Sequence, residues 1–201
     1  MLSTKKVESK NNKFLKIFNE KEDINQYWFS EQTINYIIQQ VEKHTNNNSK
    51  IAFVSCPSIF FSCSPEIQEK SILFDYDERF PKRHKNAVKF DFNDFSNISE
   101  EFHHKFDFIV IDPPFITEKV WTLYAEFANL ISILNETRTD ICSKIIACSI
   151  SENKEMLNRL IKLQIKKYQP SIPHLVYQYN FFANFDDEEL DELNKEIPSD
   201  Y

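Results

Sequence analysis

The stretch that decides the fold is Phe106-Asp107-Phe108-Ile109-Val110-Ile111-Asp112-Pro113-Pro114-Phe115. Its first six residues are apolar and partly β-branched apart from one acid, which predicts a strand buried in the centre of a sheet. The Asp112-Pro113-Pro114-Phe115 motif then lies beyond the carboxyl end of that strand, where an open α/β sheet forms its ligand crevice. Because proline fixes φ and has no N–H, the Pro113 carbonyl and the Asp112 carboxylate can be held as rigid acceptors for an amine. The same tetrapeptide is equally typical of a turn that ends a strand.

Strand and helix patterns alternate on both sides of this stretch. Strands are expected at 50–55, 71–76, 87–91 and 144–148, and a long antiparallel edge strand at 175–185. Helical spacing predicts a helix over 31–44 capped by Ser30, one over 118–134 capped by Thr117, and one opened by a Ser149/Glu152 capping box. Strands that alternate with helices predict an α/β fold with a doubly wound, mostly parallel sheet.

The charge of the chain is unevenly distributed. The 201 residues carry a net charge of −7, and their number predicts one folded domain. Residues 1–21 hold six lysines and two glutamates, so we expect a flexible basic arm over 1–22. Residues 186–201 hold eight acids and one lysine and predict a solvated, mobile acidic tail. The folded domain between them spans 23–185. Because this domain carries more acids than bases, we do not expect a nucleic-acid partner.

Several classes of site are excluded by residues that the sequence lacks. The chain has no glycine, so it contains neither a GxGxxG motif nor a P-loop. Its four cysteines form no CxxC pair and its five histidines no HExxH spacing, so we expect no metal site. No apolar run approaches the length of about 20 residues that spans a bilayer. We therefore expect a soluble, cytoplasmic protein without a membrane partner.

Acids follow three of the predicted strands. Asp75 and Asp77 lie at the end of the second strand, where a carboxylate can accept both hydroxyls of a ribose. Asp91 and Asn93 follow the third strand and could meet an adenine edge, while Asp112 follows the fourth. The first strand leads into a loop of small residues, Ser55-Cys56-Pro57-Ser58. Each acid alone is typical of an exposed turn, but together they predict one crevice.

Segments spread over about residues 25–190 match a known family in order and at natural spacings. They are Asn25-Gln26-Tyr27-Trp28-Phe29-Ser30-Glu31-Gln32-Thr33, Ile51-Ala52-Phe53-Val54-Ser55-Cys56-Pro57-Ser58, Phe74-Asp75-Tyr76-Asp77-Glu78-Arg79-Phe80, Phe90-Asp91-Phe92-Asn93, the 106–115 stretch, Pro173-His174 and Phe181-Phe182-Ala183-Asn184-Phe185. They resemble the eukaryotic elongation factor 1-alpha lysine methyltransferase 1 family, formerly called N6-adenine-specific DNA methyltransferase 2. The chain departs from that pattern at Asp75, where the family often has Glu, and in the turn 138–143.

The resemblance implies a class I, Rossmann-like methyltransferase with a seven-stranded sheet and S-adenosylmethionine as cofactor. It makes 23–185 the methyltransferase domain and implies that a monomer methylates a lysine of elongation factor 1-alpha. The implied catalytic residues are Asp112, Pro113, Pro114 and Phe115. The implied cofactor-binding residues are Trp28, Ser30, Thr33, Ser55, Cys56, Pro57, Ser58, Asp75, Asp77, Asp91 and Asp112. Trp28 and its aromatic neighbours could equally be packed in the core.

Two other functions remain open at this point. An N6-adenine methyltransferase on DNA or RNA would use the same acid-proline-proline-aromatic motif to hold a planar amine, and the basic arm favours it. Against it, a flipped base requires additional nucleic-acid contacts, for which 201 residues leave no separate domain. A methyltransferase fold without activity, acting as a binding scaffold, is disfavoured by the acids at the strand ends.

Overall fold

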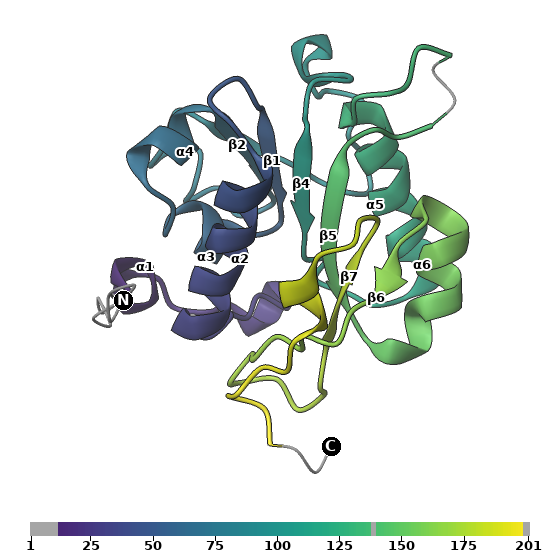
Figure 1. Cartoon of the computed structure of the whole chain (residues 1–201). Coiled ribbons are helices and arrows are strands. Elements are labelled where there is room, and N and C mark those ends of the chain that lie inside the picture. The colour runs from purple at the N-terminus through teal and green to yellow at the C-terminus, as the bar shows by residue number, and fades with distance from the viewer. Residues whose placement is uncertain (1–11, 138–139, 199–201) are drawn as a thin grey trace, which may run out of the picture.

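A computed structural model describes residues 12–137 and 140–198 of the chain (Figure 1). Its centre is a seven-stranded sheet in the order β3-β2-β1-β4-β5-β7-β6. The strands are β1 (Ile51–Val54), β2 (Ser71–Asp75), β3 (Ala87–Lys89), β4 (Phe108–Ile111), β5 (Lys144–Ser149), β6 (Gln164–Ile165) and β7 (Asn180–Ala183). The first five are mutually parallel, and β7 runs antiparallel to β5 and β6. The α/β fold class with a mostly parallel sheet is therefore confirmed.

The register of the sheet aligns the residues that follow the central strands. Val54 of β1 pairs with Phe74 of β2 on one side and with Ile111 of β4 on the other. The next residue along each strand, Ser55, Asp75 or Asp112, is consequently carried to the same edge. The Ser55 N–H donates to the Phe74 carbonyl at 2.8 Å and the Asp112 N–H to the Val54 carbonyl at 3.1 Å, which fixes this alignment.

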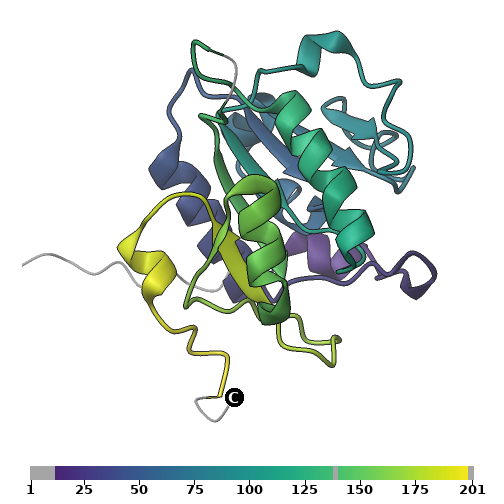
Figure 2. The ribbon, with the colours of Figure 1, turned by 90° about the vertical axis from the view of Figure 1, so that its right-hand side faces the viewer.

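Helices cover both faces of the sheet, as Figures 1 and 2 show. One face packs against α1 (Lys13–Ile17), α2 (Glu31–His44) and α3 (Pro57–Phe60), and α4 (Pro65–Glu69) follows α3. The other face packs against α5 (Glu118–Ile131) and α6 (Lys154–Ile161). Single turns of 3-10 helix are η1 (Glu22–Ile24), η2 (Glu100–Phe102), η3 (Ser151–Asn153) and η4 (Glu188–Asp191). This arrangement is the doubly wound one that the alternation of elements predicts.

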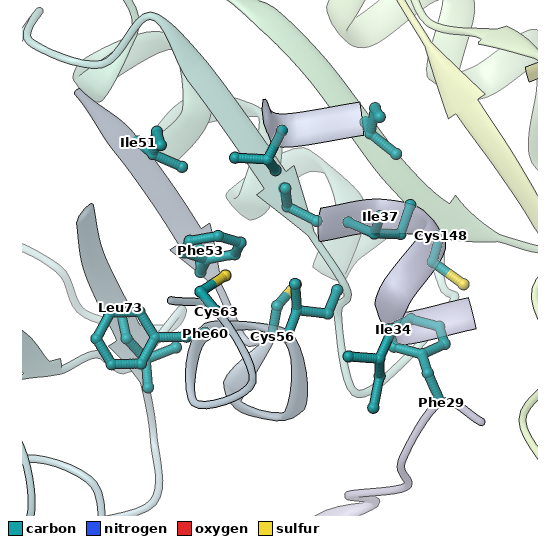
Figure 3. Packing of buried hydrophobic residues seen from close by; sticks show 14 of the residues in the cluster. Phe29, Ile34, Ile37, Ile51, Phe53, Cys56, Phe60, Cys63, Leu73 and Cys148 are labelled. Atoms are coloured by element: carbon teal, nitrogen blue, oxygen red, sulfur yellow. The ribbon is translucent and has the colours of Figure 1, made fainter. Parts of the chain in front are cut away.

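The core divides at the sheet because successive strand residues point to opposite faces. Phe53 packs edge-on against Phe60 of α3 and belongs to the cluster that includes Ile34 of α2 (Figure 3), while its neighbours Ala52 and Val54 join the cluster under α5 and α6. All four residues of β1 and all four of β4 are buried, as expected for parallel strands covered on both sides. The central strands are therefore rigid supports for the residues that follow them.

Capping explains where the two longest helices begin. Ser30 accepts the Thr33 N–H at the start of α2, and Thr117 accepts the Val120 N–H at the start of α5, so both predicted N-caps are confirmed. The predicted Ser149/Glu152 capping box is wrong. Ser149 belongs to β5, and its hydroxyl accepts from the Trp121 indole N–H and the Asn153 amide.

The predicted strand over 175–185 is much shorter in the structure. Only Asn180–Ala183 forms β7, because the preceding residues form a loop that folds back on the carboxyl edge of the sheet. Gln178 holds that loop by donating to the Pro170 and Tyr179 carbonyls. The two-residue strand β6, which the sequence did not indicate, pairs with β7 and occupies the edge.

The described parts of the two chain ends pack on the domain, and the mobility of the arm and tail stays a prediction. In the arm, Phe14 of α1 and Phe18 are buried against Trp28 and Phe61. In the tail, Leu190 of η4 is fully buried. Residues 1–11 and 199–201 of the predicted arm and tail lie outside the described residues. No helix in the described ranges is long and apolar enough to cross a membrane.

Candidate functional site

A cavity of about 280 Å³ opens at the carboxyl edge of β1, β2 and β4. Residues 23–28, the strand ends and the loop before β7 line it. Nine of the predicted site residues are in its wall: Trp28, Ser55, Pro57, Asp75, Asp91, Asp112, Pro113, Pro114 and Phe115. The sheet register brings these residues together although they are far apart in sequence. The predicted crevice therefore exists.

The end of β4 presents the motif with which the sequence analysis began. Burial raises the pKa of the Asp112 carboxyl to about 8, a hydrogen bond from the Cys148 thiol opposes this rise, and the nearby Asp75 carboxylate adds to it. Pro113 and Pro114 place no N–H next to the carboxylate. Asn25 donates its side-chain N–H to the Pro114 carbonyl, which ties the motif to the segment across the cavity. Phe115 is 47% exposed at the rim.

The end of β2 holds its aspartate more tightly. Asp75 is 5% exposed, and its Oδ1 accepts the Asp77 N–H at 2.8 Å. Burial raises the pKa of the Asp75 carboxyl to about 7 although the Asp77 amide lowers it. Among the described residues no donor is assigned to Asp75 Oδ2, so this oxygen can accept from a ligand.

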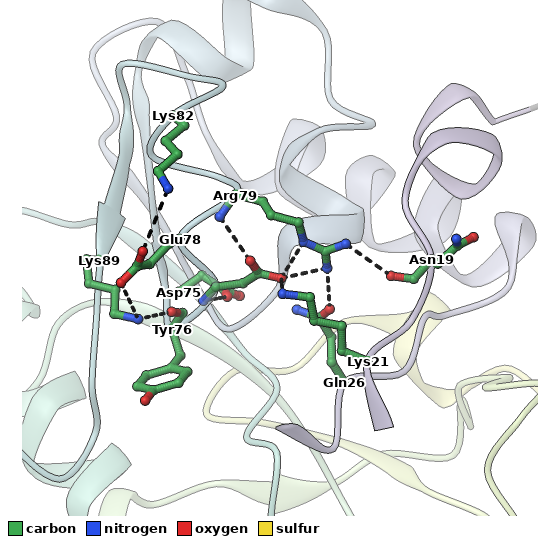
Figure 4. A network of polar contacts seen from close by, with 10 residues as sticks. Asn19, Lys21, Gln26, Asp75, Tyr76, Glu78, Arg79, Lys82 and Lys89 are labelled. Atoms are coloured by element: carbon green, nitrogen blue, oxygen red, sulfur yellow. Dashed lines mark hydrogen bonds and ion pairs between the residues drawn. The ribbon is translucent and has the colours of Figure 1, made fainter. Parts of the chain in front are cut away.

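Asp77 does not line the cavity but anchors the loop after β2. Its Oδ2 lies 3.2 Å from Lys21 Nζ and 2.6 Å from Arg79 Nη2, within the polar network in which Figure 4 shows Lys21, Gln26 and Arg79 close together. Burial would raise the pKa of Asp77, but its partners hold it below the usual value. Arg79 also donates to the Gln26 side chain at 2.9 Å. The ion pairs thus fasten residues 19–26 over the end of β2.

The remaining predicted residues support the site from outside its wall. Ser30 and Thr33 lie at the start of α2, where the Thr33 hydroxyl accepts the Ser171 N–H at 3.0 Å. Cys56 is buried, and its thiol donates to the Val54 carbonyl at 3.2 Å. Ser58 is buried in α3. Their predicted contact with the cofactor remains a prediction.

Trp28 combines the two roles that the sequence left open. It is 6% exposed and packs edge-on against Phe14 with ring centroids 5.0 Å apart, so it is a core residue. Its backbone N–H donates to Glu20 Oε1 and its indole N–H to the Phe18 carbonyl. The same ring also lines the cavity. Burial of Trp28 therefore fixes the course of residues 23–28 over the site.

The cavity wall carries acids but no base. Four aspartates line it, and no lysine or arginine does so among the described residues. They are Asp23, Asp75, Asp91 and Asp112. Asp91 Oδ1 accepts both the backbone and the side-chain N–H of Asn93, which sets these two residues side by side as predicted. In their ionised forms, these acids favour a cationic guest over an anionic one.

Several wall residues were missed by sequence reasoning. Tyr124, assigned to the apolar face of a helix, lines the cavity, and its hydroxyl lies 2.7 Å from Ser55 Oγ. Tyr179 comes from the loop that was predicted as strand. Asn25 has a left-handed backbone with φ of 53°, and the only sequence signal for it is that asparagine tolerates this conformation better than most residues. No group of three or more metal-ligating side chains exists within the described ranges.

Comparison with known proteins agrees with this geometry. The family model described as "Probable N6-adenine methyltransferase" matches residues 20–187. EEF1A lysine methyltransferase 1 of Homo sapiens is 25% identical over 174 residues, covering 85% of this chain and 77% of the relative. Protein-lysine N-methyltransferase EFM5 of Saccharomyces cerevisiae is 25% identical over 86% of this chain and 75% of the relative.

A solved structure supports the fold independently. The putative RNA methyltransferase PH1948 of Pyrococcus horikoshii superposes with a TM-score of 0.50 at 11% identity, covering 82% of this chain and 88% of that one. Its likeness extends to the fold alone. Because the family model covers most of the chain, including every strand and the whole cavity wall, this protein belongs to the probable N6-adenine methyltransferase family.

Proposed function

We propose that this protein transfers the methyl group of S-adenosylmethionine to the ε-amine of a lysine in elongation factor 1-alpha. It would act as a monomer in the cytoplasm. The observation that carries the proposal is the acidic cavity, in which Asp112 and the Pro113 carbonyl stand next to the aromatic Phe115. The relatives named as EEF1A and protein-lysine methyltransferases support the choice of acceptor.

The wall residues fit the chemical groups of this cofactor. Asp75 Oδ2 can accept a ribose hydroxyl, and Asp91 with Asn93 offers an acceptor and donors for an adenine edge. Ser55 and Pro57, which also line the cavity, would lie next to the amino-acid end. When bound, S-adenosylmethionine supplies an electrophilic methyl group on a sulfonium cation, a charge that suits a wall lined by four aspartates.

The chain's own residues would prepare the acceptor amine. Free lysine has a pKa of about 10.4, so the amine must lose a proton before its lone pair can attack. Desolvation in the cavity lowers that pKa. Asp112 and the Pro113 carbonyl would accept the amine hydrogens and aim the lone pair, which is catalysis by positioning. As the N–C bond forms and the S–C bond breaks, the face of Phe115 would stabilise the cationic product.

The direct test is methyl transfer from labelled S-adenosylmethionine to recombinant elongation factor 1-alpha, followed by mass spectrometry of the protein. We expect label on a lysine with the wild-type chain and none with Asp112→Ala, while calorimetry shows that the variant still binds the cofactor. Intact cofactor binding without any label on the factor would overturn the choice of substrate. No cofactor binding at all would point instead to a scaffold with a methyltransferase fold.

An N6-adenine acceptor in DNA or RNA is the second candidate, favoured by the description of the family model. The exocyclic amine of adenine would meet the same Asp112 and Pro113 acceptors. The four aspartates of the wall oppose it because they repel the phosphates next to a flipped base. Label on an oligonucleotide rather than on the factor, with strongly salt-dependent binding, would establish this alternative.

A further inference from the structure

The turn after β1 has an unusual backbone for its sequence. Ser55 has φ of 58°, in the left-handed region where a Cβ atom carries a steric cost. In doubly wound sheets that bind nucleotides, the first strand-to-helix turn commonly uses glycine for this reason. This chain has no glycine, so a serine occupies the strained position. Some other contact must therefore keep the turn in place.

Tyr124 provides such a contact. Its hydroxyl lies 2.7 Å from Ser55 Oγ, and both residues line the cavity. The ring is 1% exposed and packs between Phe90 and Phe92, with centroid distances of 5.8 and 5.6 Å. The hydroxyl thus projects from a fixed position on α5 across to the end of β1. The Ser55 N–H is held from the other side by the Phe74 carbonyl.

The pair also supplies a neutral donor to an otherwise acidic wall. Burial raises the pKa of the Tyr124 phenol well above its usual value, so the hydroxyl keeps its proton at neutral pH. Two hydroxyl groups hold two protons, and their mutual hydrogen bond uses one of them. The other proton can be donated to an acceptor in the cavity, whichever of the two groups provides it.

We propose that Tyr124 is a positioning residue of the cofactor site, which holds Ser55 in the left-handed turn that glycine would otherwise form. This inference rests on the proposed use of S-adenosylmethionine. Tyr124 would act on the cofactor through Ser55, by keeping the turn in the shape that binds the amino-acid end. The turn and the hydroxyl can be separated by experiment, because alanine and glycine at position 55 both lack the hydroxyl but only alanine retains the strain.

The test measures the dissociation constant for S-adenosylmethionine by calorimetry. We expect Tyr124→Phe and Ser55→Ala each to weaken binding about fivefold, the size of one neutral hydrogen bond. Ser55→Gly should weaken binding less than Ser55→Ala does, and Tyr124→Phe should weaken binding less when added to Ser55→Gly than it does in the wild type. In steady-state assays, the cofactor KM should rise by a larger factor than kcat falls. Tyr36→Phe is the matched control, because the buried Tyr36 hydroxyl belongs to α2 and Tyr36 does not line the cavity.

A readout without cofactor separates this inference from the proposed function. Amide hydrogen exchange of residues 54–56 in the ligand-free protein should be faster in Tyr124→Phe and Ser55→Ala, but not in Ser55→Gly/Tyr124→Phe. If the wild type fails to bind S-adenosylmethionine yet shows this exchange pattern, the proposed function fails and the role of Tyr124 in the turn stands. Equal weakening by Ser55→Gly and Ser55→Ala, or no effect of Tyr124→Phe on either readout, would overturn the inference.

Discussion

The carboxyl ends of β2 and β4 each carry a desolvated aspartate, yet the residues that follow treat the two side chains in opposite ways. After β2, the Asp77 N–H captures Asp75 Oδ1 at 2.8 Å. After β4, the residue in the same relative position is Pro114, which has no N–H. The residue two positions after Asp112 therefore cannot donate a backbone hydrogen bond to its carboxylate. The comparison teaches that the backbone after a strand decides whether an acid there organises the loop or remains open to a substrate.

Replacement of Asp112, whose carboxylate is not held by the following loop, should have the largest effect on kcat. We expect Asp112→Asn to lower kcat about 100-fold or more, because an acceptor aimed at the reacting amine is lost. The dissociation constant for the cofactor should change far less. Asp107→Asn, at the other end of the same strand, is the control, since Asp107 bonds the Lys50 N–H away from the cavity. Comparable kcat values for the two variants would contradict the role of Asp112.

Replacement of Asp75, whose carboxylate is held by the Asp77 N–H, should affect the binding of the cofactor more than kcat. We expect Asp75→Asn to raise the dissociation constant for S-adenosylmethionine about 30-fold, the usual size of a charge-assisted hydrogen bond. At saturating cofactor, kcat should fall by a smaller factor. The exposed Asp94→Asn variant serves as the control. If Asp75→Asn lowered kcat at saturation as much as Asp112→Asn, the two strand ends would share one role.

Replacement of one proline, Pro114, should make the end of β4 resemble the end of β2. Pro114→Ala restores an N–H two residues after Asp112, in the position from which Asp77 holds Asp75. Capture of the carboxylate should then lower kcat about fivefold, because one hydrogen bond to the amine is lost to the loop. Pro65→Ala at the start of α4 is a control outside the cavity wall. An unchanged kcat in Pro114→Ala would show that the missing N–H is not what keeps Asp112 open.

The smallest expected effect is a change of stability with pH. The pKa values of Asp75 and Asp112 are raised from 3.8 to about 7 and about 8 in the folded protein, so folding favours their protonated forms. That contribution to stability is complete below the unfolded pKa and is lost as pH rises through about 7 to 8. The melting temperature of the ligand-free protein should therefore fall by a few degrees between about pH 5 and pH 8 and level off above that range. Asp112→Asn should flatten this slope in thermal unfolding followed by circular dichroism, and an unchanged slope would contradict the assignment.

The strand ends were predictable because they depend on short-range pattern alone. The apolar run before Asp112 identifies a central strand, and the parallel register then determines which residues share its edge. Asp75 and Asp91 follow from the same rule. A strand-end position does not, however, say what the side chain faces. Asp77 follows β2 as Asp75 does, but pairs with Lys21 and Arg79 instead of lining the cavity.

The parts that failed depend on contacts distant in sequence. Charge counts predict mobile chain ends, but they carry no information on the packing of Phe14 and Leu190, which are buried in the described part of each end. The aromatic run at 175–185 has the composition of a strand, but the pairing partner β5 accommodates only its last part. Tyr124 was correctly expected on a buried helix face, while the direction of its hydroxyl follows only from tertiary packing.

Side-chain contacts between the acidic tail and the helix α2 have a consequence for synthesis of the protein. Lys43 and His44 bond Asp187, and the Ser30 hydroxyl bonds Glu196 at a separation of 166 residues. Contacts of such separation can form only after the intervening chain has left the ribosome. A nascent chain stalled before residue 187 would hold α2 without these partners. The helix that precedes β1 is thus among the first elements to be made and among the last to be fully secured.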